Sequence, residues 1–373
     1  MIYLDNCATT RPRQEVAEAL AKSIMEDFSN PSSLHSLGLR TEQRLKEVRK
    51  GLASILRVKE GEVYFTSGAT ESNNIALQGV IRKNLKRGGR IISSPIEHPS
   101  VKNVIAQYRD DIEVDYLTVN DKGEISLDEF KSLLKEDTFL VSIMHVNNEL
   151  GTIYPVEEMG RIIRGTKTRA VFHVDGTQGF MKVSLNLKDI DLYSASSHKI
   201  YGPKGVGLLY KDSSVNFNPM TYGGSQEGAI RPGTENINGI LAFGRAVRLM
   251  EERSKEEFEH VSLIKKALLE GILSKVDGVH VNSPENSSPY ILSLSFKGIR
   301  GETLLHLLEG DEIYISTSSA CSGGVSHVVE ELGLDKDYSF GTVRLCFSHE
   351  NSLKDVPYIL EKFVKYVKEL RDI

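Results

Sequence analysis

The chain has no tryptophan, only three cysteines among its 373 residues, and no long apolar run. Cys7, Cys321 and Cys346 are too few for a disulfide framework, which favours a reducing, cytoplasmic setting. No stretch approaches the roughly 18 consecutive apolar residues that a membrane-spanning helix needs. The first residues show no basic run followed by an apolar stretch, so we expect no signal peptide and no membrane partner.

An excess of basic residues is also missing. The formal net charge is −5, and both signs are mixed along the chain, which argues against a nucleic-acid-binding surface. What is present is an ordinary globular composition, with 40% hydrophobic and 26% charged residues. A chain of this length can bury one large core together with a smaller one.

Apolar periodicity predicts amphipathic helices at residues 14–25 and 39–56, separated by a polar loop. From about residue 62, short apolar runs such as 138–146 and 170–174 alternate with helical patterns. This alternation predicts a largely parallel sheet with helices on both faces, in an α/β fold. A long helical stretch near 238–274 then leads to a C-terminal part in which strands and helices alternate again.

Lys199 and Asp175 together indicate a cofactor. Lys199 is flanked by small hydroxyl residues and a histidine, as in Ser196, Ser197 and His198, which suits an aldehyde held as a Schiff base. Asp175 ends a preceding apolar run and suits the protonated ring nitrogen of the same cofactor. The pair therefore predicts pyridoxal 5'-phosphate (PLP).

The segment 66–73 ends a predicted strand and opens a helix. Gly68 permits a tight turn there, and the amide groups at the helix start can hold an anion. Thr70 either caps this helix or bonds a phosphate. Taken with Lys199 and Asp175, the phosphate interpretation is favoured.

Three more polar side chains follow strands, where an open parallel sheet binds its ligands. His98 either stacks on a flat cofactor and moves protons, or opens a helix that begins at Pro99. Asn148 either bonds a phenolic oxygen or a substrate carboxylate, or serves only in a turn. Gln178 either reaches the same oxygen or is an ordinary residue of a first helical turn.

Two residues near the C-terminus also have two interpretations each. Arg344 is a charge in an apolar strand pattern, so it either pairs with a carboxylate or lies on the solvent face of an edge strand. Cys321 lies among serines and glycines, which suits an exposed nucleophilic thiol better than a buried filler. Cys346, between Leu345 and Phe347, suits the buried alternative.

With these residues identified, nearly the whole chain resembles the cysteine desulfurases, the NifS/IscS-like branch of the fold-type I (class V aminotransferase-like) PLP enzymes. The resemblance is carried by the segments 3–6, 30–35, 66–73, 97–98, 146–149, 173–175, 196–199, 231–236 and 319–321. The Schiff-base segment is shared with related families, whereas Ser319-Ala320-Cys321 selects the desulfurases.

The resemblance implies a large PLP-binding domain at 14–255, with a mostly parallel seven-stranded sheet flanked by helices. It implies a smaller α+β domain built from 1–13 and 256–373, which carries the Cys321 loop. It also implies a homodimer in which Thr234 reaches the phosphate of the neighbouring subunit. No metal is expected.

The resemblance implies a role for each site residue. Lys199 forms the Schiff base and moves protons, Asp175 keeps the ring nitrogen protonated, and His98 stacks on the ring. The phosphate is held by Ala69 (through its backbone), Thr70, Ser196 and His198. Gln178 and Asn148 lie near the phenolic oxygen, and Asn148 and Arg344 face the substrate carboxylate.

The implied reaction removes sulfur from L-cysteine. The Cys321 thiolate attacks the substrate sulfur, alanine leaves, and a persulfide stays on Cys321. An acceptor protein then takes the sulfur for iron–sulfur cluster assembly or for tRNA or cofactor thiolation. The alternatives are a selenocysteine lyase, another class V PLP lyase, and an aminotransferase. A non-catalytic PLP-binding protein would lack Lys199 or Cys321, and both are present.

Three departures from the family pattern stand out. Cys7 replaces the usual alanine of an Asn-Ala-Ala-Thr-Thr opening, which predicts a second reactive thiol near the substrate. Residues 223–229 depart from the usual Gly-Gly-Gln-Glu pattern. The stretch from Cys321 to Val328 is shorter than the family's shortest loops.

Overall fold

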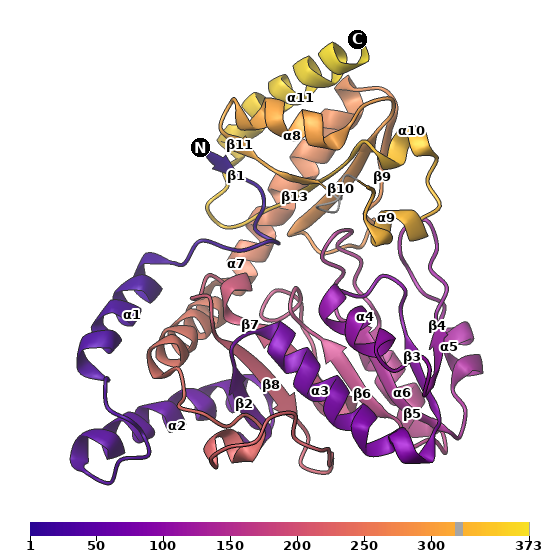
Figure 1. Cartoon of the computed structure of the whole chain (residues 1–373). Helices are drawn as coiled ribbons and strands as arrows, with labels where there is room; N and C mark the ends of the chain where they lie inside the picture. The colour runs from indigo at the N-terminus through magenta and orange to yellow at the C-terminus, as the bar shows by residue number, and fades with distance from the viewer. Residues whose placement is uncertain (318–323, 373) are drawn as a thin grey trace.

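The protein is described by a computed structural model that covers residues 1–317 and 324–372. Cys321 lies outside the described residues. Figure 1 shows a large sheet flanked by helices and, above it, a smaller sheet with its own helices. Both ends of the chain lie at the smaller part, so the first residues cross from one part to the other.

The large sheet has seven strands in the order β2-β8-β7-β6-β5-β3-β4. Only β8 runs antiparallel to its neighbours, which confirms the predicted mostly parallel sheet. In sheet order the strands are β2 (Val63–Thr66), β8 (Gly207–Lys211), β7 (Leu192–Ser196), β6 (Val171–Asp175), β5 (Thr138–Met144), β3 (Arg90–Ser93) and β4 (Glu113–Tyr116).

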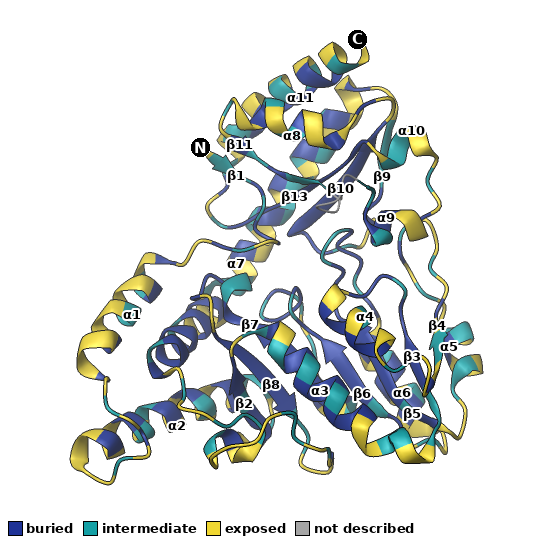
Figure 2. Ribbon diagram, in the orientation of Figure 1, coloured by how far each residue is buried: buried dark blue, intermediate teal, exposed yellow. Residues whose placement is uncertain are grey.

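Helices cover both faces of this sheet because its strands are apolar on both sides (Figure 2). Leu140 of β5 packs in the cluster that contains residues of α3 and α4, whereas the next residue, Val141, packs in the cluster that contains residues of α2, α6 and α7. The helices of this part are α1 (Gln14–Glu26), α2 (Ser36–Leu56), α3 (Ala69–Asn84), α4 (Pro99–Ala106), α5 (Leu127–Leu133) and α6 (Val156–Gly165).

The smaller part contains a four-stranded antiparallel sheet in the order β12-β13-β10-β9. The N-terminal strand β1 pairs in parallel with β11. The elements are β1 (Ile2–Tyr3), β9 (Val279–Val281), β10 (Ile291–Phe296), α8 (Gly301–Glu309), β11 (Ile313–Tyr314), β12 (Ser316–Thr317), α10 (Lys336–Ser339), β13 (Thr342–Cys346) and α11 (Val356–Arg371). The short helix α9 (His327–Glu331) follows β12 but packs Val328 into the core of the large part.

Helix α7 (Ile237–Lys275) joins the two parts. Its first half, through Met250, belongs to the core of the large part, and its second half, from Val261, belongs to the core of the smaller part. The domain limits predicted at residues 13/14 and 255/256 stay a prediction.

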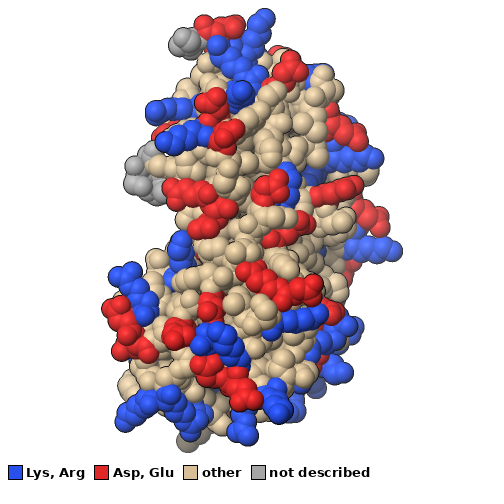
Figure 3. All heavy atoms as spheres, turned by 90° about the vertical axis from the view of Figure 1, so that its right-hand side faces the viewer, with Lys and Arg blue, Asp and Glu red and all other residues tan. Residues whose placement is uncertain are grey.

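The surface carries charges of both signs. On the face shown in Figure 3, basic and acidic side chains are interspersed. Among the described residues, no helix combines the length and the apolar character that crossing a bilayer requires.

Candidate active site

A cavity of about 570 Å³ lies at the carboxyl ends of β2, β5, β6 and β7, facing the smaller part of the molecule. Its size is typical of small-molecule sites, which span roughly 300–1,000 Å³. The sequence-predicted residues that line it are Ala69, Thr70, His98, Asn148, Asp175, Gln178, Ser196, His198, Lys199 and Arg344. The fold therefore gathers ten candidates that are spread over most of the chain.

Lys199 lies in a short turn directly after β7. Its Nζ donates hydrogen bonds to the carbonyl oxygens of Cys7 and Ala8, at 2.5 and 2.8 Å. Burial lowers the pKa of Lys199 to about 8, although the negative charge of the Cys7 thiolate acts in the opposite direction and raises this pKa. A neutral amine is thus available near neutral pH, as a Schiff-base nucleophile requires.

Asp175 is the last residue of β6 and is buried. Its carboxylate accepts hydrogen bonds from Asn73 Nδ2 (2.7 Å), the Thr177 amide (2.9 Å) and Thr177 Oγ1 (2.5 Å). These contacts fix a carboxylate at the cavity wall. Neither Asn73 nor Thr177 was among the residues predicted for the site. Asn73 lies about one helical turn after Thr70 on the same helix, but that spacing gives no sign of its hydrogen bond to Asp175.

His98 opens a helix, as one of its two interpretations predicts, and its stacking on a cofactor stays a prediction. It is the N-cap of α4, with Pro99 at the first helical position, and its Nδ1 accepts a hydrogen bond from the Ser100 amide at 3.1 Å. It also lines the cavity. Burial lowers the pKa of His98, so its ring is neutral at neutral pH.

The start of α3 lines one end of the cavity. Its N-cap is Gly68 and no side chain caps it, so the capping interpretation of Thr70 is wrong. The amide of Ser72 donates to the carbonyl of Gly68 (3.1 Å), and the amides just before it lack an acceptor within the helix. Gly207 of β8 packs against this turn: a Cβ atom there would lie 2.5 Å from Gly68 Cα.

Two adjacent asparagines follow β5, and both of the interpretations of Asn148 remain open because it lies in the turn and also lines the cavity. Asn147 closes the turn, because its Oδ1 accepts from the amides of Glu149 and Leu150, at 2.9 Å each. Of the two, Asn148 lines the cavity.

Gln178 lies in a turn rather than in the first turn of a helix, so that alternative is wrong. Its Nε2 donates to the carbonyl of Cys7 at 2.9 Å. Its Oε1 is buried and has no partner within residues 1–317 and 324–372. An orphaned buried oxygen of this kind needs a donor, which a bound ligand can supply.

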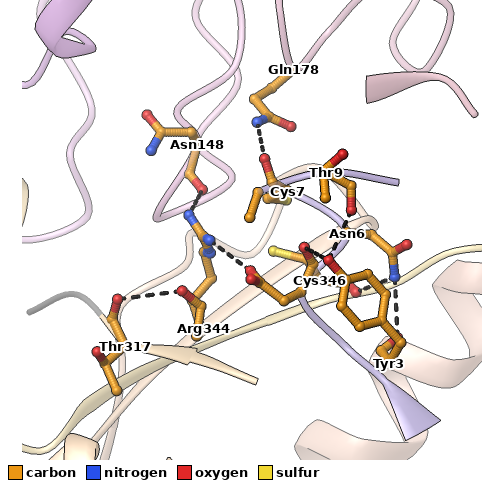
Figure 4. A network of polar contacts seen from close by, with 12 residues as sticks. Tyr3, Asn6, Cys7, Thr9, Asn148, Gln178, Thr317, Arg344 and Cys346 are labelled. Atoms are coloured by element: carbon orange, nitrogen blue, oxygen red, sulfur yellow. Dashed lines mark hydrogen bonds and ion pairs between the residues drawn. The ribbon is translucent and has the colours of Figure 1, made fainter. Parts of the chain in front are cut away.

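Arg344 is not on a solvent face, because β13 lies inside the small sheet and the side chain is only 8% exposed. Figure 4 shows its guanidinium between Asn148 and the N-terminal segment. Nη1 donates to the Asn148 carbonyl and Nη2 to Asp5, both at 2.9 Å. Nε is buried and unpartnered within the described part of the chain, which leaves a donor for a ligand carboxylate.

Two predicted residues, Thr234 and Cys321, stand apart from this set. Thr234 is exposed and does not line the cavity of its own chain. Cys321 lies outside the described residues, so its predicted role stays a prediction. Cys7, by contrast, lines the cavity. The described residues contain no group of three His, Cys, Asp or Glu side chains that could hold a metal ion.

The donor set of the cavity fits PLP. It offers a lysine amine with a lowered pKa, a buried carboxylate, an imidazole, and a helix start flanked by Thr70, Ser196 and His198. These are the groups that an aldehyde, a pyridine nitrogen, an aromatic ring and a phosphate require.

Comparison with known proteins places the chain in a family. The model of the family described as aminotransferase class-V matches residues 2–359. Cysteine desulfurase IscS of Clostridium botulinum (strain Hall) is 37% identical and covers 100% of this chain and 96% of its own length. Cysteine desulfurase IscS of Methanosarcina thermophila is 38% identical and covers 100% and 93%.

Solved structures agree with these matches. A NifS-like protein superposes with a TM-score of 0.93 at 37% identity and covers 99% of this chain and 100% of its own. An apo cysteine desulfurase of Thermococcus onnurineus NA1 gives a TM-score of 0.89 at 26% identity, covering 99% and 95%. The chain therefore belongs to the aminotransferase class-V family, among its NifS/IscS-like cysteine desulfurases.

Proposed function

We propose that this protein is a PLP-dependent cysteine desulfurase, which converts L-cysteine to L-alanine and carries the sulfur as a persulfide on Cys321. The observation that carries the proposal is the convergence of Lys199, Asp175, His98 and Arg344 on one cavity. Full-length relatives named cysteine desulfurase support the same activity.

Different residues of the cavity would hold different parts of PLP. Lys199 would hold its aldehyde carbon and Asp175 its ring nitrogen, with His98 against the ring. Gln178 and Asn148 would face the phenolic oxygen, and the start of α3 with Thr70, Ser196 and His198 would hold the phosphate. When bound, PLP supplies an electron sink that stabilises negative charge on the substrate carbons next to it.

The chain's own residues then perform the remaining steps. Arg344 would orient L-cysteine by pairing with its carboxylate. The Lys199 amine, with its pKa of about 8, would take the α proton and return protons to carbon. The Cys321 thiolate would attack the substrate sulfur: an S–S bond forms, the C–S bond breaks, and its electron pair goes to the carbon that becomes the alanine methyl group.

The persulfide is proposed to pass to an acceptor protein, for iron–sulfur cluster assembly or for tRNA or cofactor thiolation in the cytoplasm. A homodimer is also proposed, with Thr234 reaching the phosphate in the partner's cavity. The exposed apolar side chains of Phe28, Leu34 and Tyr222, which are 71%, 91% and 86% exposed, support a subunit contact.

Replacing Cys321 tests the reaction. Cys321→Ala should keep an absorbance band at about 420 nm, typical of PLP on lysine, and lose alanine and sulfide formation by at least about 100-fold. Ser322→Ala, next in sequence, is the matched control and should stay active.

Two results would contradict the proposal. Unchanged alanine release by Cys321→Ala would point to a lyase that needs no persulfide, such as a selenocysteine lyase. Sustained amino transfer from L-alanine to a keto acid would point to an aminotransferase.

A further inference from the structure

Two thiols that the proposed reaction does not use meet at the floor of the cavity. Cys7 and Cys346 are both free and buried, at 2% and 0% exposed. They belong to the same buried cluster, and Asn6, next to Cys7, donates its backbone amide and its Nδ2 to the Cys346 carbonyl, at 3.4 and 2.9 Å. They come from opposite ends of the chain and are brought together by backbone pairing, in which the Cys346 amide donates to the Leu4 carbonyl at 2.6 Å. Figure 4 shows both segments beside Arg344.

Only Cys7 of this pair lines the cavity, together with Lys199, Gln178 and Arg344. Its backbone is firmly held there, because its carbonyl accepts hydrogen bonds from both Lys199 and Gln178. Cys346 is fully buried in the same core as Cys7 and does not line the cavity. The pair is therefore arranged as an outer thiol that faces the substrate space and an inner thiol that faces away from it.

The surrounding charges make Cys7 the thiolate of the pair. Burial by itself would raise its pKa, but the hydrogen bond with Cys346 and the charges of Arg344, Lys182 and Lys199 lower the pKa of Cys7 to about 7. Burial raises the pKa of Cys346, and its hydrogen bond to Cys7 raises it further, so Cys346 keeps its proton and donates it toward Cys7.

Lys182 has no role in the proposed reaction, yet it completes this cationic surrounding. It is only 6% exposed, and its ammonium lies 5.1 Å from the centre of the Tyr290 ring. A buried cation beside a buried thiolate lowers the cost of charge on sulfur, whether that sulfur belongs to a thiolate or to a persulfide.

We propose that Cys7 and Cys346 form a second sulfur-handling site, in which Cys7 accepts a sulfane sulfur atom and Cys346 displaces it as sulfide. The donor class is a persulfide or polysulfide. The inference rests on the proposed function, which would generate such sulfur in the same cavity.

The chemistry balances in two steps. The Cys7 thiolate attacks the outer sulfur of a donor R–S–SH, an S–S bond forms at Cys7, and the donor's S–S bond breaks as R–S⁻ leaves with the electron pair. The thiol of Cys346 then attacks the sulfur of Cys7 itself. Its proton passes to the departing sulfur, which leaves as hydrogen sulfide. The two cysteines are oxidised to a disulfide and the sulfane sulfur is reduced, and a small thiol resets the pair.

The test uses the full-length, PLP-loaded Cys321→Ala protein, which retains native Cys7 and Cys346. Inorganic polysulfide is added without reductant, and the alkylated peptides are analysed by mass. We expect sulfide release and a Cys7–Cys346 disulfide in this protein. With Cys346→Ala added, Cys7 should instead retain one extra sulfur atom, and sulfide release should fall at least about 10-fold.

Two results would overturn the inference. One is that Cys7 gains neither a sulfur atom nor a disulfide, although the surface thiols of a control protein in the same sample are labelled. The other is equal labelling of Cys346 when Cys7 is replaced by alanine or by serine. Polysulfide bypasses the desulfurase step, so this test does not depend on the proposed function. Failure of the proposed function is detected separately: wild-type protein incubated with L-cysteine would form no persulfide on any cysteine.

Discussion

The two walls of the cavity are built in different ways. The wall formed by the large sheet carries Asp175 and Lys199 at or just after the ends of neighbouring parallel strands. The opposite wall carries Arg344 and Cys7, which come from the small sheet and from the N-terminal segment. Those two segments meet through the pairing of Asp5 with Cys346 and of β1 with β11.

The difference separates two tasks. The large-sheet wall holds the groups that would bind PLP, at the ends of the largely buried strands β6 and β7. The other wall holds the groups that would meet the substrate, on segments that lie outside the large sheet. The departure at Cys7 falls on this second wall. Variants on the two walls should therefore have different consequences for the cofactor and for the substrate.

The largest effect is expected on the large-sheet wall. Lys199→Ala removes the amine that would attach PLP and move protons, so alanine formation should fall by at least about 1,000-fold and the band at about 420 nm should disappear. Lys204→Ala, an exposed lysine at the same cavity, is the control and should keep the band. A band that survives in Lys199→Ala would contradict the assignment.

A smaller effect is expected on the opposite wall. Arg344→Lys keeps the charge but loses the planar donor set, so the KM for L-cysteine should rise by about 10- to 100-fold with a smaller change in kcat. The absorbance band should be unchanged, because Arg344 would touch the substrate rather than PLP. Loss of PLP from this variant would show that the two walls are not separate in function.

The smallest effect is expected on the pH dependence of PLP binding, which involves Lys199 on one wall and Cys7 on the other. Only the neutral Lys199 amine attacks an aldehyde, and its lowered pKa means that this form dominates above about pH 8. The rate at which PLP rebinds to the apoprotein should therefore rise with pH and be half-maximal near pH 8.

Cys7→Ala provides the matched comparison. The Cys7 thiolate raises the pKa of Lys199, so its loss should move the midpoint to lower pH, by less than about one unit. A wild-type midpoint near that of a free lysine, or an upward shift in Cys7→Ala, would contradict this electrostatic account.

Most of the fold was predictable because the long elements have clear periodicity. The segments at 138–146 and 170–174 are strands β5 and β6 to within two residues at each end. Two of the shortest strands, β1 with two residues and β9 with three, were not predicted, because they are too short to show an alternation. Helix α2 begins at Ser36, earlier than predicted, because His35 caps it by accepting from the Gly38 amide at 3.2 Å.

The site was predictable to the extent that its residues follow strands. Several alternatives needed the structure, because they turn on whether a side chain is buried and on what it contacts. Arg344 could be placed only once β13 was known to be an interior strand. Asn73 was missed because its importance lies in one hydrogen bond, to Asp175 more than a hundred residues away.

The sequence by itself determined the α/β class and the family, and it predicted the groups that would bind the cofactor, because strand periodicity and local motifs depend on neighbours along the chain. Only the tertiary structure decided that Cys7 lies against Cys346, next to Arg344, Lys182 and Lys199. That contact joins the two ends of the chain, and its energy comes from burial and from electrostatic interactions between groups that are close in space. Neither quantity leaves a pattern in the local order of residues.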